Sequence, residues 1–357
     1  METDVAIIGG GLAGLALADV LTRAGVDWQL LEARGRLGGR ILSAHVSGHA
    51  HDLGPAWVWP HNPLVIALAD RLGLDFFPQF SDGRLVFQEA SGAVRRDLDF
   101  STMAGALRVA GGISALTDGL ASLLPLERLH LKAPVTQISR QGGRMHITVG
   151  GTTLTANRVA LALPPRLAAT IDFTPELPRA ALESMAAIPT WMAGQAKAVA
   201  VYQQPFWREA GLSGDGISHR GPMVEIHDAS PASAAAGALF GFIGVPARAR
   251  LAHREDLRAA ILDQLTAMFG ADAGAPAELL LQDWAGEAAT ATQADFEAPP
   301  QHPHYGMPAA LQNLFDGNLI LAGSEVAPRN GGFVEGALEA AEAAALRLRE
   351  SATQAPS

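Results

Sequence analysis

The chain of 357 residues contains no cysteine. Disulfides, thiolate metal sites, cysteine nucleophiles and cofactors linked through cysteine are therefore excluded. The chain also has no surplus of basic residues, because its formal net charge is −10 and its isoelectric point is about 5.5. Binding to nucleic acid requires a basic face, and so we expect no nucleic-acid partner.

Long apolar runs and targeting signals are missing as well. No stretch approaches the roughly 18 uninterrupted apolar residues of a membrane span, because even the apolar region 191–202 is interrupted by Gln195 and Lys197. The N-terminus, Met1 to Asp4, is acidic and lacks the basic region of a secretory signal. These absences predict a cytoplasmic protein that has no membrane partner.

The composition that remains is typical of a globular protein. Apolar residues make up 48% of the chain and charged residues 17%, which is sufficient to build a hydrophobic core. The length predicts about two domains.

The first forty residues have the pattern of a βαβ unit. An apolar run at residues 4–8 predicts a strand, a helical pattern follows from residue 15, and Gly25 is a suitable helix end. Residues 28–31 predict a second strand, which ends in Glu32.

Three glycines between the first strand and the helix fit the spacing G-x-G-x-x-G. Gly9 permits the tight turn, Gly11 lets the backbone approach a pyrophosphate, and Gly14 lets the helix pack closely on the strand. The helix N-terminus would face the phosphates, and Glu32 would bind the ribose hydroxyls. Because strand, helix and terminal acid all lie at the expected distances, we interpret the motif as a dinucleotide site.

Glu32 suits NAD as well as FAD, and the residues after it distinguish the two. Arg34, Arg36 and Arg40, with the glycine pair that ends at Gly39, supply cationic and backbone donors to a pyrophosphate. A nicotinamide-binding unit does not need them, and the pattern therefore favours FAD.

With these residues included, the sequence resembles the flavin-containing amine oxidase family, to which the monoamine and polyamine oxidases belong. The resemblance extends from residue 4 to about residue 348. Its motifs follow in order: Glu32–Arg40, Asp52–Gly54 with Trp57, Gly111–Leu116, Val135–Ile138, Lys197 with Tyr202 and Pro205–Trp207, Trp284, His302–Gly306, Ala322–Glu325 and Gly331–Gly336.

The resemblance implies an α/β fold, with a Rossmann-like, doubly wound FAD-binding domain and a discontinuous substrate domain built on a mixed sheet. The FAD-binding domain is expected to comprise residues 1–76, 108–165 and 285–350. The substrate domain is expected to comprise residues 166–284 with a shortened segment at 77–107, and residues 351–357 are expected to be a disordered tail.

The shortened segment is a departure from the family, whose members carry a much longer helical part there. The difference predicts a more open substrate site, or one that a partner subunit closes, and it allows a homodimer. The C-terminal membrane helix of the animal enzymes is also absent from the sequence.

The motifs and the resemblance together indicate which residues bind FAD, expected here without a covalent bond. They are Gly9, Gly11, Gly14, Glu32, Arg34, Gly39, Arg40, Gly54, Trp57, Val135, Ser324, Glu325, Phe333 and Val334. Val135 matches the family strand that contacts the adenine.

Three residues are predicted to be catalytic. Lys197 matches the family lysine that holds a water against N5 of the flavin, and its apolar neighbours make its burial costly. Exposure on a polar strand face is the alternative for this lysine. Trp284 matches a tryptophan beside the flavin, and Phe333 matches one wall of an aromatic cage around the substrate amine.

The second cage wall is expected between Ala289 and Ala294, where the sequence has no aromatic residue. Four aromatic residues could replace it from another direction, namely Trp57, Trp59, Trp191 and Phe242. The missing wall makes a simple preference for arylalkylamines doubtful.

Histidines offer one further candidate and no metal site. His227, beside Asp228, is predicted either to contact the substrate or to end a surface strand. His45, His49 and His51 lack a convincing set of companion ligands, and so we expect no metal.

The function predicted from all of this is an FAD-dependent amine oxidase. Hydride passes from the amine α-carbon to flavin N5, and the products are an imine or aldehyde, ammonia and, after reaction with oxygen, hydrogen peroxide. Two alternatives remain, an FAD-dependent oxidase or desaturase of a non-amine substrate and a flavin-binding subunit without turnover.

Overall fold

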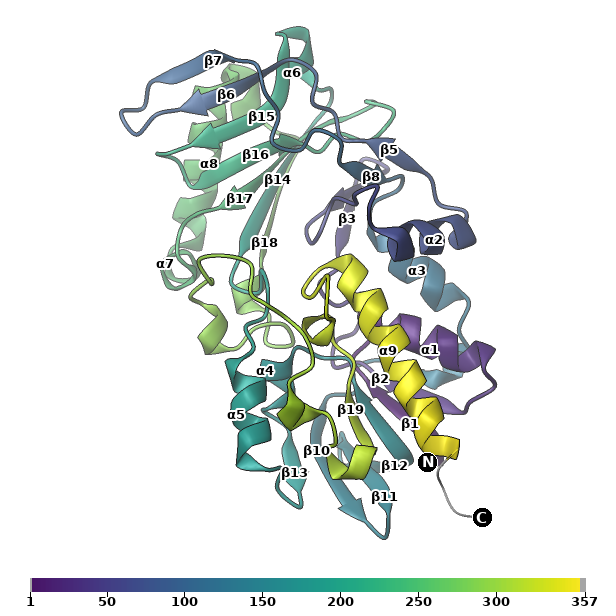
Figure 1. The fold of residues 1–357 in the computed structure, drawn as a ribbon. Coiled ribbons are helices and arrows are strands. Elements are labelled where there is room, and N and C mark those ends of the chain that lie inside the picture. Colours follow the sequence, from purple (N-terminus) through teal and green to yellow (C-terminus); the bar gives the residue numbers. More distant parts are fainter. Residues whose placement is uncertain (1, 354–357) are drawn as a thin grey trace.

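Two β-sheets organise residues 2–353, the part of the chain that the computed structural model describes (Figure 1). The centre of the first sheet is parallel, in the order β9-β2-β1-β12, with β19 also paired to β12. Its strands are β1 (Glu2–Ile8), β2 (Trp28–Leu31), β9 (Leu129–His130), β12 (Thr152–Leu161) and β19 (Leu319–Leu321). The α/β fold class predicted from the sequence is therefore confirmed.

Alternate residues of the parallel strands face two different layers. Ile7 and Leu30 pack against α1, α3 and α9, whereas Ile8 and Leu31 belong to a second core that includes α5. The helices concerned are α1 (Leu12–Arg23), α3 (Ser114–Ser122), α5 (Arg179–Ala187) and α9 (Val334–Thr353). Because both faces are covered, the strands are apolar throughout, which explains the continuous apolar run at residues 4–8.

An antiparallel part extends the first sheet on one side. The first residues of β12 pair with β11 (Arg144–Val149), which pairs with β10 (Val135–Gln141), and β13 (Asp172–Thr174) lies at the edge. The short helix α4 (Pro165–Ala168) precedes β13.

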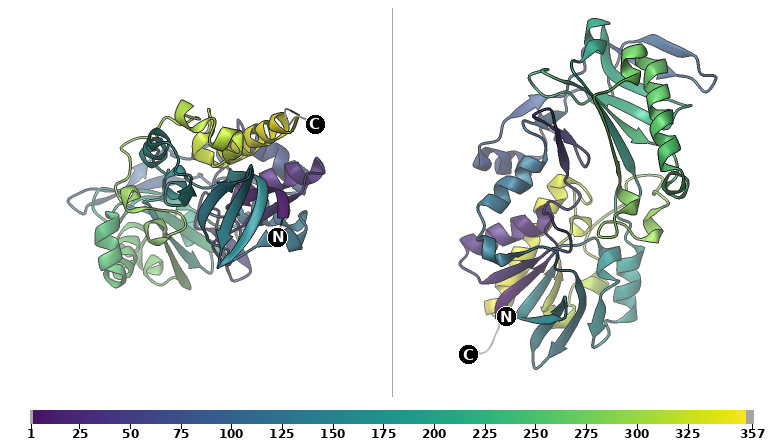
Figure 2. Two further views of the ribbon diagram at one scale, coloured as in Figure 1. Left: turned by 90° about the horizontal axis from the view of Figure 1, so that it is seen from below. Right: turned by 180° about the vertical axis from the view of Figure 1, so that it is seen from behind.

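The second sheet has seven strands in the order β18-β14-β17-β16-β15-β6-β7. Its strands are β6 (Arg84–Gln88), β7 (Val94–Leu98), β14 (Ala196–Tyr202), β15 (Leu212–Ser218), β16 (Met223–Asp228), β17 (Gly237–Ile243) and β18 (Glu278–Asp283). The helices of this lobe are α6 (Phe206–Glu209), α7 (Ala247–Ala252) and α8 (Arg254–Phe269). In the right-hand view of Figure 2, α8 covers the outer face of the sheet.

Strand alternation in β14 determines which residues face the first lobe. Ala196 and Ala198 belong to the core beneath α8, whereas Val199 and Val201 pack with Leu53 on the opposite face. Lys197 is two residues from Val199 and therefore lies on that inner face.

Short elements connect the two lobes. They are the hairpin of β3 (Ser43–Val46) and β4 (His49–Asp52), helix α2 (Pro63–Leu72), and the pair β5 (Phe76–Pro78) and β8 (Leu107–Val109). Single turns of 3-10 helix occur at Leu126–Arg128, Ala271–Gly274, Trp284–Gly286, Gln293–Asp295, Ala309–Leu311, Phe315–Gly317 and Ser324–Val326.

The strands suggest how the chain is divided. The segment 77–107 supplies β6 and β7 to the second sheet, whereas α9 returns to the first. We propose the domain borders predicted from the sequence as the division between the lobes. Helix α9 continues to Thr353, into the segment expected to be a tail, and residues 354–357 lie outside the described residues. Within residues 2–353, no helix has the length and apolar character needed to cross a membrane.

Candidate functional site

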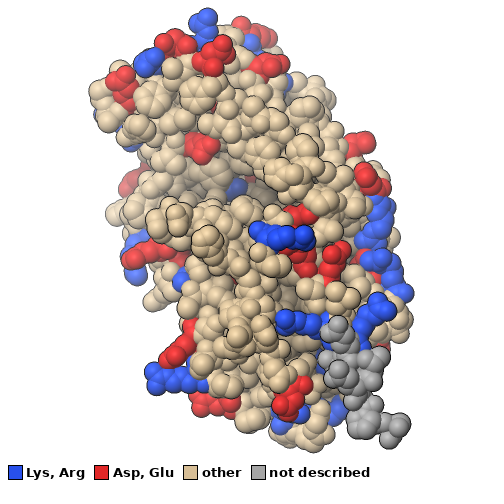
Figure 3. All heavy atoms as spheres, in the orientation of Figure 1, with Lys and Arg blue, Asp and Glu red and all other residues tan. Residues whose placement is uncertain are grey.

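A cavity of about 450 Å³ lies between the two sheets. Figure 3 shows a hollow between the two lobes on the face drawn there. The lining comes from the glycine turn after β1, from residues 38–41 and 54–62, from β14 and from the start of α9. Motifs that are far apart in the sequence therefore meet at one site.

The end of the cavity next to β1 has the groups needed to bind an anion. Gly9 has a φ of 111°, which residues with a side chain rarely adopt. Helix α1 follows Gly11, no side chain caps it, and its first hydrogen bond joins the amide of Leu15 to the carbonyl of Gly11. The amides of Leu12 and Ala13 precede that bond, and both residues line the cavity. Such a helix N-terminus is suited to a phosphate group.

The other two motif glycines meet different steric needs. A Cβ atom on Gly14 would lie 1.9 Å from the carbonyl oxygen of Gly9, and so only glycine lets α1 pack on β1. A Cβ atom on Gly11 would meet nothing nearer than Gly39 Cα at 3.8 Å and Gly38 O at 3.9 Å. It would project into the gap between two glycine segments. That gap fits the pyrophosphate of a dinucleotide.

Glu32 closes this end of the cavity. Its buried carboxylate accepts hydrogen bonds from the amide of Gly10 at 2.7 Å and from the amide of Arg34 at 2.8 Å. Both bonds fix the carboxylate at the end of β2, where ribose hydroxyls would be bound.

Two of the three predicted arginines reach the cavity. Arg40 forms an ion pair with Glu325 at 2.6 Å and donates to Ser324 Oγ at 3.0 Å. Arg34 donates to Thr290 Oγ1 and lies 3.4 Å from Glu287. Arg36 differs from the prediction, because its guanidinium turns to backbone carbonyls, including Leu37 O at 3.1 Å, and does not line the cavity.

The wall formed by β14 and the loop after β4 carries the most specific geometry of the site. Trp284 Nε1 donates to the carbonyl of Leu53 at 3.0 Å, and Lys197 Nζ donates to the carbonyl of the next residue, Gly54. Both side chains line the cavity and both are buried. Two of the three predicted catalytic residues thus converge on adjacent peptide units.

The environment of Lys197 favours its uncharged form. Burial lowers the pKa of Lys197 to about 7, and the charge of Asp52 opposes this only in part. Its Nζ lies 4.8 Å from the ring centres of Phe240 and Phe242, contacts that stabilise the charged form and so oppose the effect of burial. The alternative of an exposed lysine does not agree with this position.

Trp57 also lines the cavity, and polar side chains contact it. Its Nε1 donates to Gln79 Oε1 at 2.9 Å, and its ring contacts His227 edge to face at 5.0 Å. His227 lies between two carboxylates, with Asp215 and Glu225 each 3.0 Å from a ring nitrogen. Burial alone would lower the pKa of His227, but these hydrogen bonds outweigh it and raise the pKa above its usual value.

His227 is therefore placed differently from both predictions. It is buried, which rules out a surface strand end, and it does not line the cavity. A direct contact with substrate does not agree with this position, because Trp57 and Phe240 pack against the imidazole ring.

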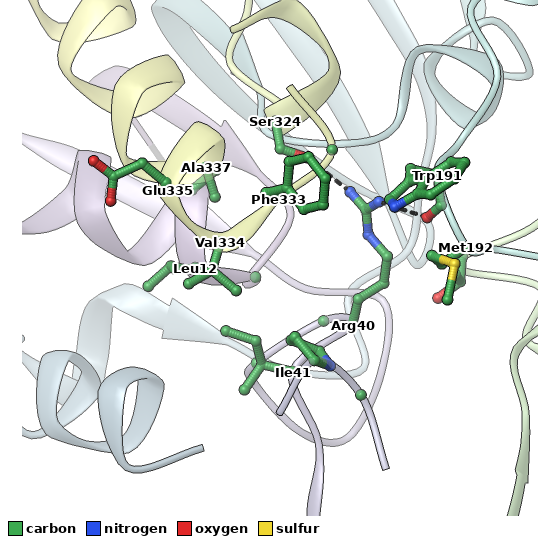
Figure 4. Close-up of a pocket in the computed structure, with 18 of the residues that line it drawn as sticks. Leu12, Arg40, Ile41, Trp191, Met192, Ser324, Phe333, Val334, Glu335 and Ala337 are labelled. Atoms are coloured by element: carbon green, nitrogen blue, oxygen red, sulfur yellow. Dashed lines mark hydrogen bonds between the residues drawn. The ribbon is translucent and has the colours of Figure 1, made fainter. Parts of the chain in front are cut away.

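Phe333 stands at the start of α9, with its side chain 49% exposed at the cavity (Figure 4). It stacks on His302 with ring centres 4.6 Å apart, and Trp191 contacts the same histidine edge to face at 4.8 Å. Only Ala289 and Thr290 line the cavity from the segment where the resemblance expects a second aromatic wall. The four aromatic residues named as replacements, Trp57, Trp59, Trp191 and Phe242, all line it.

Most of the residues predicted to bind the cofactor lie at this cavity: Gly9, Gly11, Glu32, Arg34, Gly39, Arg40, Gly54, Trp57, Ser324, Phe333 and Val334. Gly14 and Glu325 do not line the cavity. Gly14 lets α1 pack on β1, and Glu325 forms an ion pair with Arg40. Val135 does not line this cavity and packs with the core that includes β10 and β11, and its contact with the cofactor stays a prediction.

Sequence reasoning missed several residues of the site. Gln79 positions Trp57, and Met103, Met192 and Gln195 line the cavity. They lie in loops or at strand ends whose approach depends on tertiary packing, and no motif around them signals it. Among the described residues, no group of three histidine or acidic side chains could hold a metal ion.

Comparisons with known proteins agree with this geometry. The family model described as flavin containing amine oxidoreductase matches residues 12–93 and 87–349. The putrescine oxidase of Kocuria rosea is 26% identical over 98% of this chain and 95% of its own. Its alignment runs over 468 positions, more than this chain's 357 residues, and so the relative carries insertions.

Solved structures share the fold. Putrescine oxidase bound to putrescine superimposes with a TM-score of 0.81 at 22% identity, over 98% of this chain and 99% of that one. Cyclohexylamine oxidase from Brevibacterium oxydans gives a TM-score of 0.83 at 21% identity, over 99% and 100% of the two chains. With the family match extending over most of the chain, the protein belongs to the flavin-containing amine oxidoreductases and uses a flavin cofactor.

Proposed function

We propose that this chain oxidises amines with FAD that is held without a covalent bond. Amine, oxygen and water would give aldehyde, ammonia and hydrogen peroxide. The observation that carries the proposal is the convergence of Lys197 and Trp284 on the adjacent carbonyls of Gly54 and Leu53 at the cavity wall. The absence of cysteine excludes a cysteinyl link to the cofactor.

When bound, FAD supplies the acceptor for the hydride of the carbon–hydrogen bond next to nitrogen and the route of its electrons to oxygen. The glycine turn, the N-terminus of α1, Glu32 and Arg40 would hold its dinucleotide part. The N-terminus of α9, which begins at Val334, would stabilise negative charge nearby.

The side chains around the reacting end have separate tasks. Because burial lowers its pKa to about 7, Lys197 can be uncharged near neutral pH and can then accept a hydrogen bond from a water molecule. Trp57, Trp284 and Phe333 form apolar walls that exclude water and orient the amine.

The proposal is tested by the absorbance of the purified protein under anaerobic conditions. A yellow protein that is bleached by an amine and that releases peroxide on admission of air is the expected result. A yellow protein that no amine bleaches would instead favour a non-amine substrate. The small side chains of Ala289 and Thr290, in place of an aromatic cage wall, are the observation that favours this alternative. A colourless protein that does not take up FAD would refute the proposal.

A further inference from the structure

Few charged side chains line the cavity. Two acidic residues, Glu32 and Glu335, are found among the described residues that line it, and both are engaged. Glu32 binds two amides at the dinucleotide end. Glu335 accepts from the amides of Leu64 and Val65 at 2.9 and 3.0 Å, and so caps α2.

Three acids of the second sheet that lie outside the lining are also paired. Asp215 and Glu225 hold His227 between them, behind Trp57. Asp228 binds Trp207 and Arg208, both at 2.9 Å. None of these three carboxylates lines the cavity.

The basic groups at the lining are Lys197, Arg34, Arg40 and His61. Arg34 and Arg40 already pair with Glu287 and Glu325, and a bound pyrophosphate would lie with them at the dinucleotide end of the cavity. The other residues that line the cavity are mainly apolar, among them Trp59, Trp191, Met192 and Met103. Figure 3 shows that uncharged side chains form most of the surface around the hollow, with a basic group inside it and an acidic group above it.

An ammonium group that enters such a cavity loses its water without gaining a carboxylate partner, which is unfavourable. Aromatic faces recover part of this loss. An apolar chain of the same size gains free energy from burial against the same walls. Both kinds of substrate carry the amino group that reacts, and so the group at the opposite end of the molecule determines which substrate is preferred.

On the basis of the function proposed above, we propose that the substrates are primary amines with a single amino group on an apolar alkyl, cycloalkyl or arylalkyl group, and that diamines and polyamines are poor substrates. Similarity does not decide this point, because relatives named for putrescine and for cyclohexylamine match about equally well. The small side chains of Ala289 and Thr290 leave room for a bulky group.

The test compares two amines with the same number of heavy atoms, heptylamine and 1,6-diaminohexane, on the FAD-loaded protein. Anaerobic bleaching of the flavin gives kcat/KM for each. We expect heptylamine to be favoured by about tenfold or more, a factor that corresponds to roughly 1.4 kcal/mol. A diamine that is oxidised as fast as heptylamine, or faster, overturns the inference while the proposed function stands. Bleaching by neither amine, and by no other amine of the kinds named above, overturns the proposed function itself.

A variant adds the missing charge. Met103→Glu introduces a carboxylate at the lining, and Met103→Gln is the matched control of nearly equal size. We expect the glutamate variant to raise kcat/KM for 1,6-diaminohexane relative to heptylamine by about fivefold or more, and the glutamine variant to leave that ratio within about twofold of the wild type. The same ratio in both variants would contradict the charge argument.

Discussion

Replacement of Lys197 by methionine separates the charge of this side chain from its size. Lys197 is buried on the inner face of β14, and burial lowers its pKa to about 7. The unfolded chain carries a lysine with the ordinary value of 10.5. Between these two values the unfolded state binds more protons than the folded state, and so wild-type stability rises with pH. Lys197→Met removes this dependence.

The size of the effect follows from the two pKa values. Each pH unit inside the window contributes at most about 1.4 kcal/mol. Between pH 7, where the folded lysine is half protonated, and pH 9, the free energy of unfolding of the wild type should rise by roughly 2 kcal/mol relative to Lys197→Met. Other titrating groups are shared by both proteins and cancel in the difference.

Urea unfolding of the FAD-loaded proteins at pH 7, 8 and 9 measures this difference. The pKa can also be measured directly, because the chain has only two lysines, Lys132 and Lys197. Isotope labelling of lysine gives two NMR signals, and Lys132→Met assigns them. Lys132→Met is also the control for unfolding, since that side chain is exposed.

Two results would refute the reasoning. Parallel stability profiles of wild type and Lys197→Met would show that the buried lysine does not lose its proton in this range. A Lys197 signal that titrates near pH 10 would show the same directly. If the lysine also takes part in the reaction, the variant should lower kcat/KM for amine by about tenfold or more, without a loss of bound FAD.

Three further predictions concern the turn, the buried histidine and the cage. Gly14→Ala should lower the free energy of unfolding, measured in urea, by about 1–3 kcal/mol because its Cβ meets Gly9. Gly11→Ala should change stability little but weaken FAD binding, measured by titration, by about tenfold. Equal effects of the two substitutions would contradict the assigned roles. His227→Gln should lower the free energy of unfolding by about 3 kcal/mol at pH 6, and this difference from wild type should shrink as the pH rises. The reason is that a raised pKa stabilises the folded state below the unfolded-state pKa of 6.5, and this stabilisation is lost as the pH rises through the folded-state pKa. A difference independent of pH between 6 and 9 would count against a charged imidazole. Phe333→Ala should alter stability by less than about 1 kcal/mol, since the ring is half exposed, yet lower kcat/KM for amine about tenfold; an unchanged kcat/KM would remove Phe333 from the site.

The glycine turn could be predicted from sequence because its requirements are local. Gly9 needs a positive φ, Gly14 must admit a neighbouring backbone atom, and each need restricts one residue. The face of Lys197 does not follow from alternation in the sequence, because every residue of β14 is buried, and its prediction depends on the resemblance. The structure also agrees with the predicted α/β fold class.

The position of His227 could not be predicted in this manner. Alternation shows which face of β16 a residue occupies, but not what covers that face. Trp57 covers it from a loop about 170 residues earlier in the chain, and Gln79 fixes that tryptophan. His227 therefore lies between two carboxylates, and not at the cavity, because of tertiary contacts that no local pattern encodes.

Tertiary contacts also explain how the family can vary the segment 77–107 while the cavity wall is retained. Gln79 near its start donates to the carbonyl of Asp228, and Arg108 just beyond its end donates to the carbonyls of Ala229 and Ser230. Both ends are thus fixed on three successive peptide units, and Gln79 also binds Trp57. Changing the length of a loop between fixed ends costs little free energy. The family match is divided at residues 87–93, inside the segment and away from both anchors. Insertions or deletions at that point would leave both anchors and Trp57 in place.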